Sequence, residues 1–161
     1  MKNNEVLRSV RYIFDLNDSK MITVFGLGGL DVTRAQVSDW LKREDDPNFK
    51  SCSDPQLVQF LNGLIVHRRG KLDGPQPPPE KHLTNNSIFK KLRIALDLQS
   101  DGLLEIMALA RFHISQHEIS AFFRKPEHKN FRLCKDQVLR NFLRGMQIKY
   151  RPDVPALDSE D

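Results

Sequence analysis

The chain has 161 residues and a formal net charge of +4; 39% of its residues are hydrophobic and 29% are charged. It contains no apolar run of about 18 residues, which excludes a membrane-spanning helix, and its N-terminal segment lacks the apolar region of a signal peptide. We therefore expect a cytoplasmic protein whose two cysteines, Cys52 and Cys134, are small buried thiols rather than a disulfide.

One pattern of 68 residues occurs twice: residues 3–70 align with residues 85–152 without a gap. Sixteen of the 68 aligned pairs are identical, and they cluster in blocks such as NFKSCSDPQLVQFLNGL over NFRLCKDQVLRNFLRGM. We name these segments the first copy and the second copy. Positions that both copies share are expected to serve the fold, and positions that only one copy has are better candidates for function.

The second copy carries most of the positive charge. The first copy has nine basic and nine acidic residues and is neutral, whereas the second has thirteen basic and six acidic residues, a net charge of +7. The tail at residues 153–161 is acidic, with four acidic residues and no basic one. A basic segment of this size is compatible with nucleic-acid binding without establishing it.

The first predicted helix covers residues 5–16, where an apolar stripe of helical period is formed by Val6, Val10, Ile13 and Phe14. Asn3 or Asn4 is predicted to cap its first turn, and the same Asn-Asn pair recurs at residues 85–86. Within this helix Arg11 lies four residues before Asp15, and Arg93 lies four before Asp97. That spacing predicts an ion pair within each helix.

Two further helices are predicted over residues 19–27 and 33–43. The second of these begins with a capping box, in which Thr33 is followed three residues later by Gln36, and Ser115 with Glu118 repeats the signal in the second copy. The segment GLGGLD at residues 26–31 lies between these helices. We interpret it as a helix C-terminal turn that uses glycine for positive φ, not as a phosphate-binding loop.

The last helix of each copy gives the clearest pattern. Asp54 is predicted as its N-cap and Pro55 as its first residue, with the helix continuing to about Arg68, and Asp136 repeats the cap. Gly63 and Gly145 interrupt these two helices, where glycine costs about 1 kcal/mol relative to alanine. Because both copies keep this glycine, we expect a close helix crossing at that point.

These elements predict an all-α protein of two tandem four-helix repeats related by a pseudo-twofold axis. The predicted boundaries are a first repeat at 1–70, a Pro-rich linker at 71–84, a second repeat at 85–152 and an acidic tail at 153–161. A core of 68 residues is only marginally stable alone, so the two copies are expected to pack together.

The segments NNEVLRSVRYIFDL, DWLKRED, CSDPQLVQFLNGLI, NNSIFKKLRIALDL and EHKNFRLCKDQVLRNFLRGM together resemble the bacterial YehS-like family, a duplicated helical domain of unknown function. The resemblance covers almost the whole chain except the spacer and the tail. It implies a small cytosolic bacterial protein with two repeats, and it transfers no catalytic residue.

The candidate catalytic and metal-binding patterns are weak. His113, His117, Glu118 and His128 fall close together, but His113 precedes the helix start at Ser115 and does not share a helical face with His117. Neither cysteine has a sequence context that points to a catalytic histidine. We expect no metal, no cofactor and no enzymatic activity.

A helix-turn-helix interpretation of residues 21–43 gives the leading functional hypothesis. It predicts buried positions at Leu27, Val37 and Trp40. The predicted nucleic-acid-binding residues, from both copies, are Arg34, Gln36, Lys42, Arg43, Gln116, Arg124, Lys125, Lys129 and Arg132. Acidic residues in the first copy oppose this interpretation, and two angled helices are common in any helical bundle.

The sequence therefore predicts a non-enzymatic cytosolic binding or regulatory protein. DNA or RNA is the leading ligand, bound through the helix-turn-helix-like segments and the basic second copy. The alternative is a protein-protein interaction module without a nucleic-acid role, which would present an exposed apolar patch. The identity of the ligand and the role of the acidic tail stay open.

Overall fold

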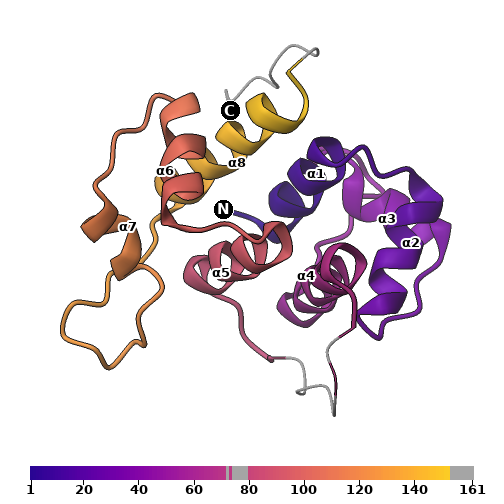
Figure 1. Cartoon of the computed structure of the whole chain (residues 1–161). Helices are drawn as coiled ribbons and strands as arrows, with labels where there is room; N and C mark the ends of the chain where they lie inside the picture. Colours follow the sequence, from indigo (N-terminus) through magenta and orange to yellow (C-terminus); the bar gives the residue numbers. More distant parts are fainter. Residues whose placement is uncertain (72, 74–79, 153–161) are drawn as a thin grey trace.

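The computed structural model describes residues 1–71, 73 and 80–152, and within these ranges the chain forms eight helices and no strand (Figure 1). The first copy contains α1 (Asn3–Ile13), α2 (Asp18–Leu27), α3 (Arg34–Leu41) and α4 (Asp54–Arg69). The second contains α5 (Asn85–Leu96), α6 (Ser100–Leu109), α7 (Gln116–Ala121) and α8 (Asp136–Tyr150). The all-α prediction is confirmed. Residues 72 and 74–79 of the predicted Pro-rich linker (71–84), and all of the acidic tail, lie outside the described residues.

The first helix of each copy begins earlier than predicted and has a different cap. Lys2 precedes α1, and the Thr84 side chain caps α5 by accepting a hydrogen bond from the Ser87 N–H. The two asparagines lie inside the helix, so the prediction that they cap it is wrong. Both helices end before a left-handed aspartate, Asp15 at φ 53° and Asp97 at φ 52°.

The capping boxes at α3 and α7 are confirmed. Thr33 Oγ accepts from the Gln36 N–H at 3.1 Å, and Gln36 Oε1 accepts from the Thr33 N–H at 2.8 Å. Ser115 and Glu118 repeat both contacts at 3.0 Å. The last helix of each copy departs from prediction by one residue, because the N-cap positions are Ser53 and Lys135 rather than the aspartates that follow them.

A close crossing explains the glycine inside each long helix. A Cβ atom at Gly63 in α4 would lie 1.8 Å from the carbonyl oxygen of Val24 in α2, and one at Gly145 in α8 would lie 2.1 Å from that of Ile106 in α6. Both distances are far below van der Waals contact. The predicted crossing is therefore confirmed, and in each copy the last helix packs tightly on the second.

The turn after α2 also agrees with prediction. α2 ends at Leu27, with Gly28 as its C-cap, and the next glycine, Gly29, has a φ of 93°. A positive φ of this size favours glycine because a Cβ atom would clash with the backbone. The GLGGLD segment is thus a helix-terminating turn.

The two copies share one hydrophobic core and pack through their first and last helices. α1 of the first copy lies against α8 of the second, and α4 lies against α5 (Figure 1). The contacts come in equivalent pairs. Arg69 donates to the carbonyl oxygen of Ile94, and Arg151, the equivalent residue, donates to that of Tyr12. This exchange is what a pseudo-twofold axis between the copies requires.

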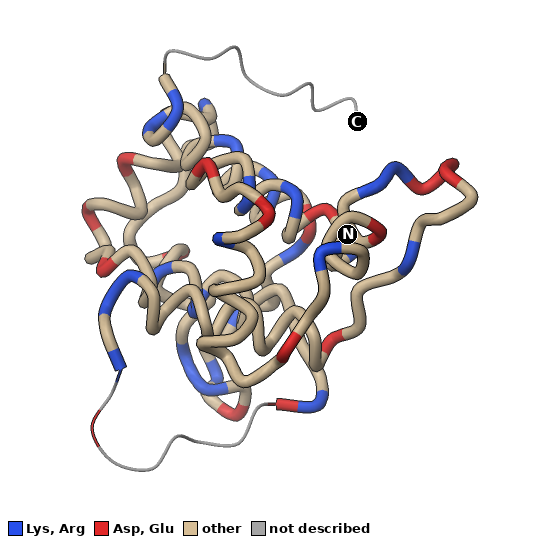
Figure 2. Tube along the Cα trace, turned by 90° about the vertical axis from the view of Figure 1, so that its right-hand side faces the viewer, with Lys and Arg blue, Asp and Glu red and all other residues tan. Residues whose placement is uncertain are grey.

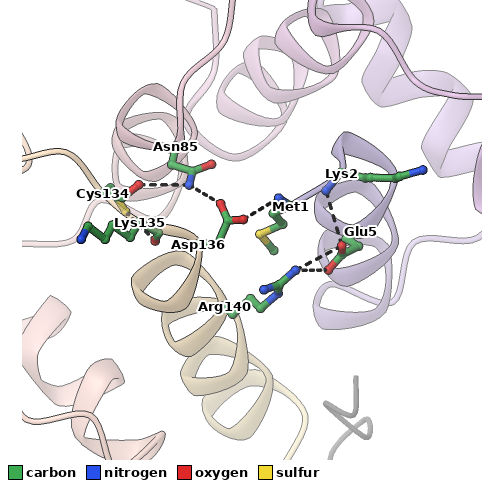
Figure 3. Close-up of polar contacts among 8 residues, drawn as sticks. All are labelled: Met1, Lys2, Glu5, Asn85, Cys134, Lys135, Asp136 and Arg140. Carbon is green, nitrogen blue, oxygen red and sulfur yellow. Dashed lines mark hydrogen bonds and ion pairs between the residues drawn. The ribbon is translucent and has the colours of Figure 1, made fainter.

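A second pair of equivalent contacts lies at the N-terminal ends of the long helices. The Asp54 carboxylate accepts from the Leu83 N–H at 3.1 Å, and the Asp136 carboxylate accepts from the Met1 amine at 2.6 Å. Figure 3 shows the Asp136 contact between α1 and α8, together with an ion pair of 3.4 Å between Arg140 and Glu5. The aspartate at the N-terminus of each long helix therefore binds the segment that leads into the first helix of the other copy.

The predicted Arg-Asp pairs within the first helices do not form. Arg11 lies 3.6 Å from Asp18, while Asp15 lies 3.8 Å from Arg151 of the other copy. Because Asp15 adopts a left-handed backbone conformation after the helix, it does not continue the helical face on which Arg11 lies. The aspartate serves the interface between copies instead.

None of the helices in the described ranges combines the length and hydropathy that a bilayer-spanning segment needs.

Candidate nucleic-acid interface

The predicted interface residues lie on α3 and α7 or in the segments that follow these two helices. α2 and α6 precede them as the first helix of each pair. Val37 and Trp40 are buried as predicted, whereas Leu27 is 44% exposed. α2 directs Val24 and Phe25 into the core. Leu27 follows Val24 by three positions but lies about 200° around the helix from Phe25, so it stands at the edge of the buried face. The buried position assigned to Leu27 is therefore wrong.

In the first copy, all four predicted binding side chains are engaged within the protein. The Arg34 guanidinium lies 3.4 Å from the Asp18 carboxylate, and the Gln36 amide belongs to the capping box. Lys42 lies 2.5 Å from Asp39, and Arg43 lies 3.7 Å from Asp45. Figure 2 shows basic and acidic positions interspersed along the chain. Each of the three predicted cations of the first copy thus has a carboxylate partner.

The second copy leaves its cations more available. Lys125 and Lys129 are exposed, and within the described part of the chain no carboxylate pairs with either. Arg132, 3.5 Å from Glu118, is the one predicted residue of this copy that forms an ion pair with another described residue. Arg124 has its Nη1 atom buried without a hydrogen-bond partner in the same ranges. Gln116 is exposed at the start of α7.

Arg132 lines a groove with a volume of about 500 Å³, and Lys125 and Lys129 precede it in the same loop. The apolar side chains of its lining come from the α6–α7 connection, the C-cap of α7, the loop before α8 and α8 itself. They are Phe112, Ile114, Phe122, Phe131, Leu133 and Val138. The polar lining consists of His113, Glu118, Arg132 and Lys135. The side chain of Leu133 is 71% exposed, the highest value among the large apolar side chains that the structure exposes.

The lining of the groove differs between the copies at particular positions. Leu133, Lys135 and Val138 stand where the first copy has Ser51, Ser53 and Gln56. In the first copy, Lys2 also lies over the Phe49 ring, 5.9 Å from its centre, at the position equivalent to Phe131. The first copy also has apolar residues at four of the lining positions, Leu30, Val32, Trp40 and Phe49. What the second copy adds to this shared surface is Leu133, Lys135 and Val138.

The two asparagines at the start of α5 hold the walls of the groove. Asn86 donates to the carbonyl oxygens of Phe122 and Arg132, at 3.0 and 2.8 Å, and accepts from the Cys134 N–H at 2.9 Å. Asn85 donates to the Cys134 carbonyl oxygen and to the Asp136 carboxylate. The same contacts recur at Asn3 and Asn4, so they belong to the fold of each copy.

Sequence reasoning predicted Arg132 as a binding residue but missed the apolar residues of the groove. The signal that could have found them is the comparison of the copies, since Leu133 and Val138 are apolar where their counterparts are polar. The helix-turn-helix pattern predicted cations as binding residues and did not predict the apolar side chains of the groove.

The titrating groups of this region give no sign of an activated nucleophile. Burial, reinforced by the nearby Asp136 carboxylate, raises the pKa of the Cys134 thiol to about 12, which keeps it protonated near neutral pH. Hydrogen bonds from Ser115, with a contribution from Arg132, lower the pKa of Glu118. Among the described residues, no three histidine, cysteine or acidic side chains gather into a metal-binding group.

Comparison with known proteins gives a family but no activity. The family described as "Protein of unknown function (DUF1456)" matches the chain twice, over residues 3–70 and 85–151. The Escherichia coli (strain K12) protein named "Uncharacterized protein YehS" is 46% identical over 150 residues, which cover 92% of this chain and 96% of that protein. No solved structure gives a significant match. The predicted family resemblance and internal duplication are confirmed.

Proposed function

The chain belongs to the DUF1456 family, and we propose that it is a non-enzymatic cytoplasmic protein that binds nucleic acid through its second copy. The observation that carries this proposal is the contrast between the copies. The four candidate side chains of the first copy are engaged internally, whereas Lys125 and Lys129 have no carboxylate partner in the described ranges.

Phosphate groups are the ligands that such cations suit. Each lysine or arginine that neutralises a phosphate releases condensed counterions, and this term dominates binding that does not depend on sequence. The net charge of +7 on the second copy attracts a polyanion over a distance comparable to the Debye length. We therefore assign phosphate contacts to Arg124, Lys125, Lys129 and Arg132.

The dimensions of α7 argue against base readout by an inserted helix. It has six residues, which corresponds to about 9 Å of helix, whereas a recognition helix lies along the major groove and contacts several bases. The loop that follows α7 carries the cations instead. The proposal accordingly retains the four predicted cations of the second copy, assigns no contact to Gln116, and gives the first copy a structural role.

The cysteines support the cytoplasmic, non-enzymatic part of the proposal. Cys52 and Cys134 are free and buried, which suits a reducing compartment. Burial, with nearby Asp54 contributing, also raises the pKa of the Cys52 thiol to about 12, so neither thiol is a ready nucleophile.

The test is fluorescence-anisotropy titration with labelled DNA and RNA oligonucleotides at about 50 and 200 mM salt. For the four phosphate contacts assigned above, this rise in salt lowers affinity by roughly 50–150-fold. Arg124→Ala with Lys125→Ala should weaken binding and flatten its salt dependence.

The first copy supplies the matched control, because Lys42 and Arg43 occupy the equivalent positions. Lys42→Ala with Arg43→Ala should change affinity much less, since those cations already have carboxylate partners. Equal losses from both double variants would place the interface on both copies. Absence of binding at the lower salt concentration would refute the proposal.

A protein partner is the second candidate function, favoured by the exposed Leu133 and the groove around it. Such a partner would bind with weaker salt dependence and would depend on the apolar lining more than on the cations.

A further inference from the structure

We infer that the groove of the second copy holds an unstacked base, so that the nucleic acid this protein prefers is single-stranded. This inference rests on the proposed function and adds the class of nucleic acid. Two observations support it together. The groove is apolar with aromatic side chains in its lining, and cations lie along its border.

The groove has the surface that an unstacked base requires. Phe112 and Phe131 are both partly exposed, and they line the groove together with the exposed Leu133. Single-stranded nucleic acid is commonly bound by stacking its bases on aromatic side chains, and this mode tolerates any base because every base has a π-face. The groove is a half-open surface depression of about 500 Å³ and not an enclosed cavity.

Cations lie where the phosphates on either side of such a base would pass. Arg132 and Lys135 line the groove itself, and Lys129 precedes Arg132 in the same loop. Arg132 has an exposed carboxylate partner, Glu118, and an exposed pair of this kind contributes little to stability. A phosphate would have to displace Glu118 from Arg132. Lys129, which pairs with no carboxylate in the described ranges, is therefore the stronger phosphate ligand of this loop.

A duplex does not offer the same contact. Its base faces are covered by stacking, and only the edges reach the grooves. The apolar groove is bounded by the α6–α7 connection on one side and by the loop before α8 on the other, which suits one flat group entering between them. Duplex DNA would contact the cations and leave the groove unused.

The test compares three labelled probes of one length at one salt concentration: a single-stranded oligonucleotide, the same strand with abasic sites, and the duplex. One stacked base should make the intact single strand bind roughly 5- to 150-fold tighter than the abasic strand. Phe131→Leu should remove most of this difference. Leu133→Ser, which installs the residue of the first copy at an exposed position, should reduce it without affecting folding.

Phe49→Leu is the matched control, because Phe49 is the equivalent residue of the first copy and lies outside the proposed site. It should leave the preference for intact single strands unchanged. Thermal unfolding of each variant separates a lost contact from a lost fold. Phe131→Leu and Phe49→Leu should show similar melting temperatures if the binding loss reflects stacking.

The outcomes distinguish this inference from the proposed function. If abasic and intact strands bind equally and the Arg124→Ala, Lys125→Ala variant weakens both, the protein binds phosphates only and the stacking inference fails. If no probe binds at about 50 mM salt, the proposed function fails as well. Competition by poly-glutamate as strong as by the oligonucleotide would overturn both and favour an acidic protein partner.

Discussion

Arg69, at the end of α4, donates a hydrogen bond of 2.9 Å to the carbonyl oxygen of Ile94 in α5, and its guanidinium lies 3.3 Å from the carboxylate of Asp97. Arg151 makes the equivalent contacts with Tyr12 and Asp15 across the pseudo-twofold axis. Both copies have the arginine and the aspartate, because the same pair of residues forms at two equivalent places in the interface between the copies.

Arg69→Ala should lower the free energy of unfolding by about 1 kcal/mol, which corresponds to one hydrogen bond in a partly exposed setting. Urea unfolding monitored by circular dichroism measures the change. Arg43→Ala, which removes only an exposed pair with Asp45, is the control and should have little effect. Equal effects from the two substitutions would show that the contact between copies adds no stability.

Gly63→Ala should destabilise the protein by about 3 kcal/mol or more, because the added methyl group would overlap the backbone of α2. Gly26→Ala is the contrasting substitution, since it lies in helical backbone with nothing within 4 Å of the new Cβ atom. It should stabilise by about 0.5–1 kcal/mol through helix propensity. Chemical denaturation of both variants checks the predicted difference in sign.

Asn4→Ala should cost about 3 kcal/mol, because Asn4 is 2% exposed and bonds to the Trp40 and Lys50 carbonyl oxygens and the Cys52 N–H. The equivalent Asn86→Ala should cost less, since Asn86 is only partly buried. Unfolding midpoints give the comparison. A larger loss for Asn86→Ala would contradict this ranking.

Asn86→Ala should also weaken oligonucleotide binding, because Asn86 ties together the two chain segments that carry Phe122 and Arg132. Asn4→Ala should not, provided that the variant is folded under the assay conditions. Anisotropy titration at a temperature well below both melting points is the measurement. If Asn86→Ala binds the oligonucleotide as tightly as the unaltered protein, the contacts of Asn86 with the groove are not needed for binding.

The two thiols should react slowly in the folded protein. With the pKa of Cys52 and of Cys134 raised to about 12, only about one thiol in ten thousand is ionised at pH 8, against about a quarter at the ordinary pKa of about 8.5. The rate of reaction with a disulfide reagent should therefore rise at least about a thousandfold on unfolding. The same shift means that stability declines as the pH rises above about 8.5. Rapid labelling of the native protein would contradict the buried placement.

Stability should also decline in acid through Asp136. The Met1 amine, followed by the Asn85 amide and the Arg140 charge, holds the pKa of this carboxyl below its usual range. Its ionisation stabilises the folded state above the unfolded pKa of about 4, and this contribution is lost as the pH falls through the lowered pKa. Asp136→Asn should flatten the acid limb of a stability-pH profile. An unchanged acid limb would show that the contacts in Figure 3 carry no net stabilisation.

The features that were predicted correctly from the sequence depend mainly on residues that lie close together in the chain. Helix periodicity, the capping boxes at Thr33 and Ser115, and the repeated glycines at Gly63 and Gly145 depend on residues a few positions apart or on one close backbone contact. The internal duplication strengthened each of them, because a signal that occurs twice at the same offset is unlikely to arise by chance.

The tertiary structure decided which side chains are available. Arg11 and Asp15 have the spacing of a helix pair, yet their partners are Asp18 and Arg151, and the asparagines expected to be caps tie α1 to a loop about 50 residues away. In the same way Arg34 is neutralised by Asp18, while Lys125 has no carboxylate partner within the described residues. Helix periodicity and the capping boxes depend on neighbours in sequence, and these the sequence alone determined. Charge pairing and the groove depend on neighbours in space, which only the packing of the two copies settled.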